Sequence, residues 1–200
     1  ALAISLATTS VAASWAWVTD PSDMADSSGD LSAISAYVLG ENLYLSMSVY
    51  GVAAPATEQT PTDMQNRYYY HWLLDTDNNP ATGRSTAEYE GKPTGVQNPI
   101  GYELAIQVGW NGGKPDGIIV YDSADEDTNI IEDYDYQEGG NTISAVIPLA
   151  DLGLTVGQTI AISAFQEGPS GGWATDWMES AAFALEPPAS GRMMIDGEFA

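Results

Sequence analysis

The sequence contains no cysteine, one histidine and five basic residues among 200 positions. Without cysteine, the chain cannot form a disulfide scaffold, an iron–sulfur cluster or a thiol nucleophile. The single histidine, His71, argues against a His-rich zinc site and against a Ser-His-Asp triad. No stretch approaches the ~18 uninterrupted apolar residues of a membrane-spanning helix. These absences leave few routes to catalysis, and we expect that the protein is not an enzyme.

Acidic residues outnumber basic ones by 28 to 5, which gives a formal net charge of −23. This charge excludes ordinary binding to nucleic acids or to an anionic membrane surface, because so few cations cannot displace the counterions of many phosphates. It also favours secretion into a salty or calcium-containing medium, so we expect an extracellular or cell-surface location. The remaining partner classes are divalent cations, neutral ligands such as glycans, and copies of the same chain.

The apolar content of 44% and the charged content of 16% are typical of a folded domain rather than a disordered acidic tail. In the segment Asn42–Tyr50, the apolar residues Leu43, Leu45, Met47 and Val49 alternate with polar or aromatic ones. A period of two places alternate side chains on opposite faces of a strand. This segment is therefore predicted to be a β-strand with one face in the core.

Similar segments recur at intervals of about 8–15 residues with turn signals between them, as in a β-sandwich. The expected strands are Ser32–Leu39, Asn42–Tyr50, Arg67–Asp75, Tyr102–Trp110, Gly117–Tyr121, Ile130–Tyr136, Asn141–Ile147, Thr159–Phe165, Ser180–Leu185 and Met193–Phe199. The one expected helical turn is Pro148–Gly153, which has proline near its start and glycine at its end. The sequence predicts an all-β fold, an antiparallel β-sandwich, with a single domain over residues 15–200.

The first 19 residues carry no charged side chain, and Leu2, Ile4 and Leu6 alternate with smaller residues. This is the period of a strand. We therefore expect residues 1–14 to form an N-terminal extension that supplies an extra strand, a candidate donor strand for a sheet edge. One alternative is that both chain ends fold back into their own sandwich. Another is a signal-peptide remnant, because the small residues of Ser10–Ala13 are typical of a cleavage site.

The loop Asp75–Gly83 follows an expected strand and carries oxygen-bearing side chains at Asp75, Asp77, Asn79 and Thr82. Oxygen ligands at alternate positions of a tight loop, completed by backbone carbonyls, suit a hard cation such as Ca²⁺. The loop is not an EF-hand, because proline stands where that motif needs glycine. The alternative is a metal-free loop of Asx turns, which the same residue types support.

Two further acidic segments could hold cations. Eight carboxylates lie within the 17 residues from Asp122 to Glu138, with no basic residue between them, and Asp125 and Asp127 are the candidate ligands. Such a run repels itself unless salt or a cation screens it. The loop from residue 20 to residue 30 offers Asp26 and Asp30 in the same way. For both segments, a solvated metal-free loop remains the alternative.

Six tryptophans and eleven tyrosines could stack on sugar rings. Trp110 and Trp173 adjoin glycine-rich turns where a ligand could approach, and Trp177 lies near the second of these in the sequence. The alternative is that these rings belong to the core or to an interface. His71 stands in the middle of an expected strand, where a partly buried histidine with satisfied hydrogen bonds is expected.

Three segments resemble those of secreted CBM9-like (DOMON-like) β-sandwich domains: Tyr68–Gly83 (YYYHWLLDTDNNPATG), Gly40–Leu45 (GENLYL) and Asn141–Gly153 (NTISAVIPLADLG). The resemblance extends over residues 15–186. It implies a jelly-roll-like sandwich on an extracellular protein, often with structural calcium. The residues that match its cation-site positions are Asp75, Asp77, Asn79 and Glu103. Only some members of the family bind sugars, so the fold does not settle the function.

One departure from that family suggests exchange between copies. Such domains often begin with a strand of the type Ile-Asp-Gly-x-Phe, whereas here Ile195–Phe199 stands at the end of the sequence. An exchanged strand adds main-chain hydrogen bonds along a sheet edge, and a head-to-tail contact that does not close makes a filament or tube. This is analogous to donor-strand polymers such as archaeal cannulae and TasA-like fibres. The sequence therefore predicts a calcium-binding subunit of an extracellular homopolymer, with a non-catalytic carbohydrate-binding module as the alternative.

Overall fold

The structure of the chain is a computed structural model. It describes residues 14–53, 67–85, 100–111, 114–122, 128–131, 134–136, 140–167, 176–187, 194–195 and 198–199. The predicted donor strand with Leu2, Ile4 and Leu6 lies outside these residues, as do Asp125, Asp127 and Trp173. No helix in the described part of the chain is long and apolar enough to cross a membrane.

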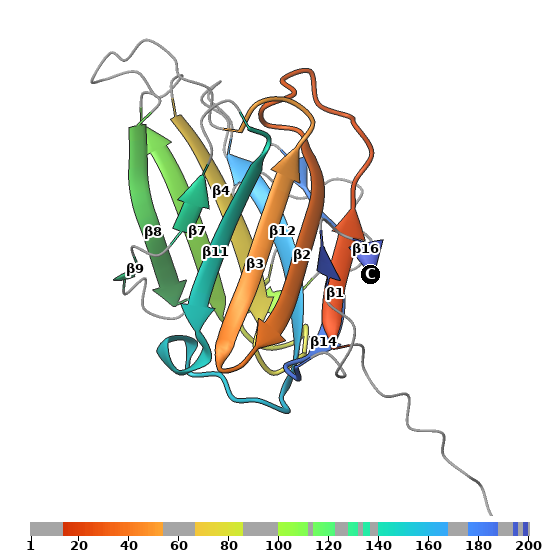
Figure 1. The fold of residues 1–200 in the computed structure, drawn as a ribbon, viewed down its shortest axis with the longest axis vertical. Helices are drawn as coiled ribbons and strands as arrows, with labels where there is room; N and C mark the ends of the chain where they lie inside the picture. The colour runs from red at the N-terminus through yellow and green to blue at the C-terminus, as the bar shows by residue number, and fades with distance from the viewer. Residues whose placement is uncertain are drawn as a thin grey trace, which may run out of the picture.

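Two antiparallel sheets form the body of the molecule and lie face to face (Figure 1). The first sheet has the strand order β1 (Trp15–Thr19), β2 (Leu31–Leu39), β3 (Asn42–Val49), β11 (Thr142–Pro148), β10 (Tyr134–Tyr136). The second has the order β13 (Asp176–Trp177), β12 (Thr159–Glu167), β4 (Arg67–Asp75), β7 (Leu104–Asn111), β8 (Lys114–Asp122), β9 (Thr128–Ile131), and β14 (Ala181–Ala184) also pairs with β12. The predicted all-β antiparallel sandwich is confirmed.

Two short strand pairs and one helical turn lie outside the two main sheets in the described structure. The strands β5 (Arg84–Ser85) and β6 (Gly101–Tyr102) form one short pair, and β15 (Met194–Ile195) and β16 (Glu198–Phe199) form another. The segment predicted as one C-terminal strand is therefore two short ones. The 3₁₀ turn η3 (Leu149–Leu152) confirms the predicted single helical turn.

The core lies between the two sheets, and the alternation in the sequence builds it. On β3 the apolar residues are buried and the intervening ones are partly exposed, as predicted. On β4 the residues that face the core include Tyr70 and Trp72, both fully buried. Trp72 Nε1 donates a hydrogen bond to the carbonyl oxygen of Ser46 on β3 at 3.3 Å, which links the two sheets. Alternating strands therefore give one continuous apolar layer.

The opposite face of the second sheet carries a smaller cluster of buried side chains. Its members are Leu73, Ile100, Tyr102, Ala105, Phe165 and Trp177. Phe165 stacks on Trp177 with ring centroids 4.5 Å apart and on His71 with centroids 4.0 Å apart. The strand β4 is therefore buried on both faces, which explains why its sequence is almost uninterrupted in aromatic and aliphatic residues.

Candidate metal centres

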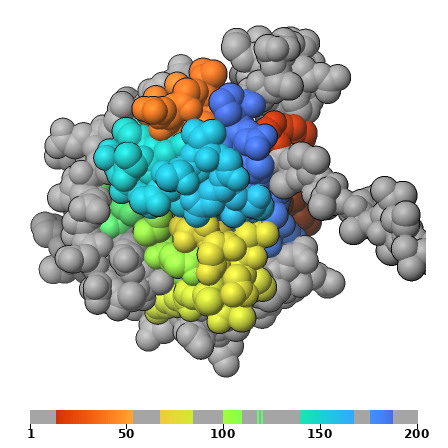
Figure 2. Space-filling model, turned by 90° about the horizontal axis from the view of Figure 1, so that it is seen from below, coloured from red at the N-terminus to blue at the C-terminus, as the bar shows by residue number. Residues whose placement is uncertain are grey.

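The loop predicted to bind calcium brings three carboxylates together at one end of the sandwich. Asp75 ends β4, Asp77 follows it, and Glu103 lies between β6 and β7. Each residue has a carboxylate oxygen within 4.8 Å of one from each of the other two. The segment that contains Asp75 and Asp77, shown in yellow in Figure 2, lies at this end of the molecule beside the segment of residues 140–167, shown in cyan. Gln158 Nε2 donates to the carbonyl oxygen of Thr76 at 2.5 Å and holds the loop there.

Hydrogen bonds within the loop fix the positions of these carboxylates. The backbone N–H of Asn79 donates to Asp75 Oδ1 at 2.9 Å and to Asp77 Oδ1 at 3.0 Å. Thr82 Oγ1 donates to Asp77 at 2.9 Å, and the amide oxygen of Asn79 accepts from the N–H of Ala81. These are the Asx turns of the metal-free alternative, so they do not by themselves identify a cation site. They leave Asp77 and Thr82 in contact but direct the Asn79 side chain back to the loop.

Glu103 supplies the observation that the Asx turns do not explain. Glu103 Oε2 accepts a hydrogen bond from the backbone N–H of Thr76 at 2.7 Å and another from the Thr76 hydroxyl at 3.1 Å. Its Oε1 is buried and has no hydrogen-bond donor in the described part of the molecule. A buried carboxylate oxygen without a partner carries a desolvation penalty of about 1–3 kcal/mol. A bound cation would remove that penalty.

The charge balance of this cluster is also unfavourable without a cation. Burial raises the pKa of Asp75 to about 6; the Asn79 N–H opposes this shift, while the charges of Glu103 and Asp77 add to it. Gly83 lets the loop approach Glu103 closely. Its φ is +66°, and a Cβ at this position would lie 2.6 Å from Glu103 Oε1. The fold therefore holds three like charges together on a backbone that only glycine adopts easily.

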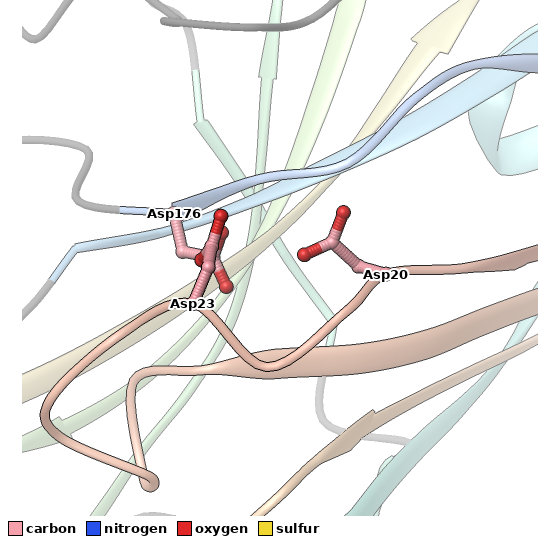
Figure 3. A group of neighbouring side chains, drawn as sticks. All are labelled: Asp20, Asp23 and Asp176. Atoms are coloured by element: carbon pink, nitrogen blue, oxygen red, sulfur yellow. The ribbon is translucent and has the colours of Figure 1, made fainter.

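A second group of three carboxylates was only partly anticipated from the sequence. Asp20 follows β1, Asp23 lies in the next loop, and Asp176 lies on β13, and oxygens of all three lie within 4.8 Å of one another. Figure 3 shows the three side chains gathered between these segments. Asp176 is 5% exposed and its Oδ2 accepts a hydrogen bond from the N–H of Leu31 at 2.6 Å. The group therefore connects the first sheet to the second.

Within the described part of the chain, the charges that shift the pKa values of this second cluster are those of further acids. Burial raises the pKa of Asp176 to about 7, with the Leu31 N–H opposing the shift and the charges of Asp20, Asp23 and Asp30 adding to it. Burial and the neighbouring acids Asp23, Asp30 and Glu179 raise the pKa of Asp20 to about 6. Asp20 Oδ2 is buried and has no hydrogen-bond partner among the described residues. Both clusters thus combine close carboxylates with an unpartnered buried oxygen.

The predicted ligands Asp26 and Asp30 lie in the same loop but act there as hydrogen-bond acceptors. Asp30 is fully buried and accepts from Ser22 Oγ at 2.6 Å. Asp26 accepts from the N–H of Ser28 at 3.1 Å and from the hydroxyl of Tyr68 at 2.9 Å. Neither belongs to a group of three acids in the described structure. In the described structure, Asp20 and Asp23 are the residues of this acidic loop that converge with Asp176.

Of the three aromatic candidates for sugar stacking, the structure describes the side chain of Trp177 alone. Trp177 is 8% exposed and stacks on Phe165 in the core cluster of the second sheet, so it does not present the open ring face that a sugar needs. Trp110 lies on β7 in register with Tyr68 and Pro115. Its side chain, like all of Trp173, lies outside the described residues.

His71 is more deeply buried than predicted, at 4% exposed, and its hydrogen bonding also differs from the prediction. Its Nε2 has no hydrogen-bond partner within the described ranges. The nearest charged atom recorded is Glu167 Oε2, at 3.7 Å. The imidazole is held instead by stacking on Phe165.

No protein-family model matches the sequence, and no curated protein does. Among solved structures, the chain is similar to a Bacteroides uniformis protein that is provisionally described as carbohydrate-binding. The two share 12% sequence identity with a TM-score of 0.38, and the alignment covers 90% of this chain and 80% of the other. The likeness to CBM9-like domains remains a prediction from the sequence. What the chain is shown to be is an all-β antiparallel sandwich with two acidic clusters that could hold metal ions.

Proposed function

We propose that this protein is a secreted, non-enzymatic β-sandwich whose fold is stabilised by calcium at the two acidic clusters. The observation that carries the proposal is that each cluster contains a buried carboxylate oxygen without a partner, Glu103 Oε1 in one and Asp20 Oδ2 in the other. All the side-chain donors are oxygens, which suits a hard cation. Ca²⁺ accepts about six to eight oxygens in irregular geometry, whereas Mg²⁺ demands a near-ideal octahedron.

A cation at either cluster would stabilise the fold by joining segments that are distant in the sequence. Asp75 and Asp77 would be joined to Glu103, and Asp20 and Asp23 to Asp176. A ligand that binds only the folded state adds about 2.7 kcal/mol of stability at a concentration of 100 Kd. At a net charge of −23, bound cations would also reduce self-repulsion.

The proposed biological role is that of a structural subunit in an extracellular filament or tube, built by strand exchange. Two features support it. The strand β1 is an edge of the first sheet and, within the described structure, pairs in the ladder only with β2. The strand-like stretch with Leu2, Ile4 and Leu6 precedes β1 in the sequence and belongs to the proposed extension of residues 1–14. A strand at the edge of a sheet can pair with a strand from another copy.

Light scattering and negative-stain microscopy test this role. Purified protein should form regular filaments or tubes in millimolar calcium and lose them in chelator. Deletion of residues 1–9 should abolish the polymers, while its thermal unfolding in calcium should match that of the full chain. Monomers of 21.2 kDa under both conditions would overturn the assembly role. The calcium proposal would stand or fall separately, on the binding measurements.

A second candidate function is non-catalytic glycan binding. The observation that favours it is a set of aromatic side chains on the outer face of the first sheet, including Trp17, which is 40% exposed. Exposed aromatic faces stack on the apolar faces of sugars. A screen of neutral glycans separates this function from assembly, because deletion of residues 1–9 should leave glycan binding unchanged.

A further inference from the structure

The outer face of the first sheet is free of charge across four strands. On β1, β2, β3 and β11, the residues that alternate with core residues carry aromatic, aliphatic, amide or hydroxyl side chains, and no acidic or basic one. The first acidic residue in register is Asp135 on β10, which lies beyond Ser144. In a chain with 28 acidic residues, an uncharged surface of this extent is a distinctive feature.

Large side chains form one row across this face. The strand register places Trp15, Tyr37, Tyr44 and Val146 opposite one another on the four strands. All four are partly exposed. The rings of Tyr37 and Tyr44 stack with their centroids 4.9 Å apart and their planes 11° apart, so they stand side by side like the neighbouring strands. These large side chains therefore form a ridge that runs across the four strands.

Apart from Trp17 on β1, small side chains form the adjacent row, which lies two residues away on each strand. Here the register aligns Trp17, Ser35, Ser46 and Ser144. Ser35 is only 9% exposed, whereas Trp17 is 40% exposed at the β1 end. The next row is also small, and its Ser48 and Thr142 hydroxyls lie 3.0 Å apart. Two rows of mostly small, hydroxyl-bearing side chains therefore lie beside the row of large ones. The first of them, the serine row, has the exposed indole of Trp17 at its β1 end.

We propose that this face binds a neutral, linear oligosaccharide that lies along the serine row, with Trp17 stacked on one sugar ring and the partly exposed Ser46 and Ser144 hydroxyls bonded to sugar hydroxyls. The proposal rests on the candidate function of glycan binding and assigns its site. From β1 to β11 the row spans three strand spacings, about 14 Å, which accommodates a short oligosaccharide. The sequence had placed the sugar platform elsewhere, at Trp110, Trp173 and Trp177.

The charge and the size of the face select this ligand over others. An anionic ligand would be repelled by a protein of charge −23, and a cationic one would be drawn to the acidic loops. A neutral sugar matches a surface of hydroxyls and rings. A second copy of the chain is a poorer fit, because a face of about 14 by 20 Å buries roughly 560 Å² in a symmetric pair. Specific protein interfaces bury at least about 1,000 Å².

The test is a binding screen of the full chain in calcium, with soluble neutral glycans (linear glucans, mannan, xylan and chitin oligomers) and polygalacturonate as the anionic comparison. The variants are Trp17→Ala, which removes the indole, and Ser46→Asp, which places a negative charge in the serine row. Val156→Ala is the matched control, because Val156 is a 51% exposed side chain in the loop before β12. Trp173→Ala tests the competing platform. Thermal unfolding verifies that every variant is folded.

We expect the wild type to bind a neutral glycan and not polygalacturonate. Trp17→Ala and Ser46→Asp should each weaken binding about tenfold or more, while Val156→Ala and Trp173→Ala bind as the wild type does. Unchanged binding by both face variants would overturn the assigned site but leave glycan binding intact, and loss in Trp173→Ala alone would move the site to the glycine-rich loop. If the wild type binds no glycan, both the site and the candidate function fail. A calcium-independent dimer that Ser46→Asp dissociates would also contradict the proposal, because the occupant would then be a second copy.

Discussion

Replacing Glu103 with glutamine should make the protein more stable than the wild type in chelator but less stable than the wild type in calcium. The change keeps an oxygen that can accept the hydrogen bonds from Thr76, but it removes one of three clustered charges. Two unit charges 4.8 Å apart repel by about 1 kcal/mol in water and by about 3.5 kcal/mol at an effective dielectric constant of 20. Without a cation, Glu103→Gln should therefore stabilise the fold, by about 1 kcal/mol because Glu103 is partly exposed.

In calcium the same substitution should be destabilising relative to the wild type. Suppose that loss of this charged ligand raises the calcium Kd from 100-fold below the calcium concentration to about that concentration. The change would remove about 2 kcal/mol of the roughly 2.7 kcal/mol that binding at this site supplies. For a domain of this size, 1 kcal/mol corresponds to about 2–4 °C in Tm. This site should therefore supply about 5–10 °C of the wild type's gain on addition of calcium. Glu103→Gln should lose most of that share and keep the gain that comes from the second cluster.

Thermal unfolding at pH 7.5, with decalcified protein in chelator and again in excess calcium, measures the difference in stability between Glu103→Gln and the wild type in each condition. Glu41→Gln is the matched control, because Glu41 is exposed in the turn between β2 and β3 and belongs to neither cluster. It should behave as the wild type in both conditions. An equal calcium-induced gain in Glu103→Gln and in the wild type would refute the assignment of Glu103 as a ligand. Lower stability of Glu103→Gln in chelator would refute the repulsion argument.

Three further predictions concern the same clusters. In chelator, the free energy of unfolding should rise as the pH falls from about 7 toward 4. The pKa of Asp75 is raised to about 6 and that of Asp176 to about 7, so the folded state binds protons more tightly than the unfolded state. Denaturant titrations across this range should show this slope of stability against pH, and calcium should flatten it. Asp176→Asn should remove much of that slope and reduce the calcium-induced gain in Tm, whereas the exposed Asp151→Asn should change neither; equal slopes in the two variants would exclude Asp176 as the source. Gly83→Ala should destabilise the protein by about 1–2 kcal/mol in urea unfolding and weaken calcium binding, because its φ is +66° and the new Cβ would press on Glu103 Oε1; wild-type values for both would show that the loop relaxes freely.

The fold was largely predictable because its signals are local. The alternation in Asn42–Tyr50 fixes which face of β3 is buried, and Gly40, with a φ of +64°, makes the short turn from β2. The aromatic run of β4 predicted a strand, but not that both of its faces would be covered. The pairing of β3 with β11 joins segments about 100 residues apart, and no local pattern specifies it.

The candidate sites were predictable only where their ligands are neighbours in the sequence. Asp75 and Asp77 stand in one loop, and the resemblance to a known family added Glu103. Asp176 has no acidic neighbour that marks it, since it meets Asp20 only when β13 is placed against the start of β2. The serine row was likewise not predictable from the sequence, because each serine alone looks like an ordinary polar position of a strand. What the sequence could not provide is the register that aligns them.

Calcium binding to decalcified protein, measured by isothermal titration calorimetry at pH 7.5, tests the central claim most directly. The account predicts at least two calcium ions per chain, with one site lost in Glu103→Gln and a different one lost in Asp176→Asn. Magnesium should bind more weakly to both. Absence of binding at millimolar calcium, or a stoichiometry that neither substitution changes, would contradict the account.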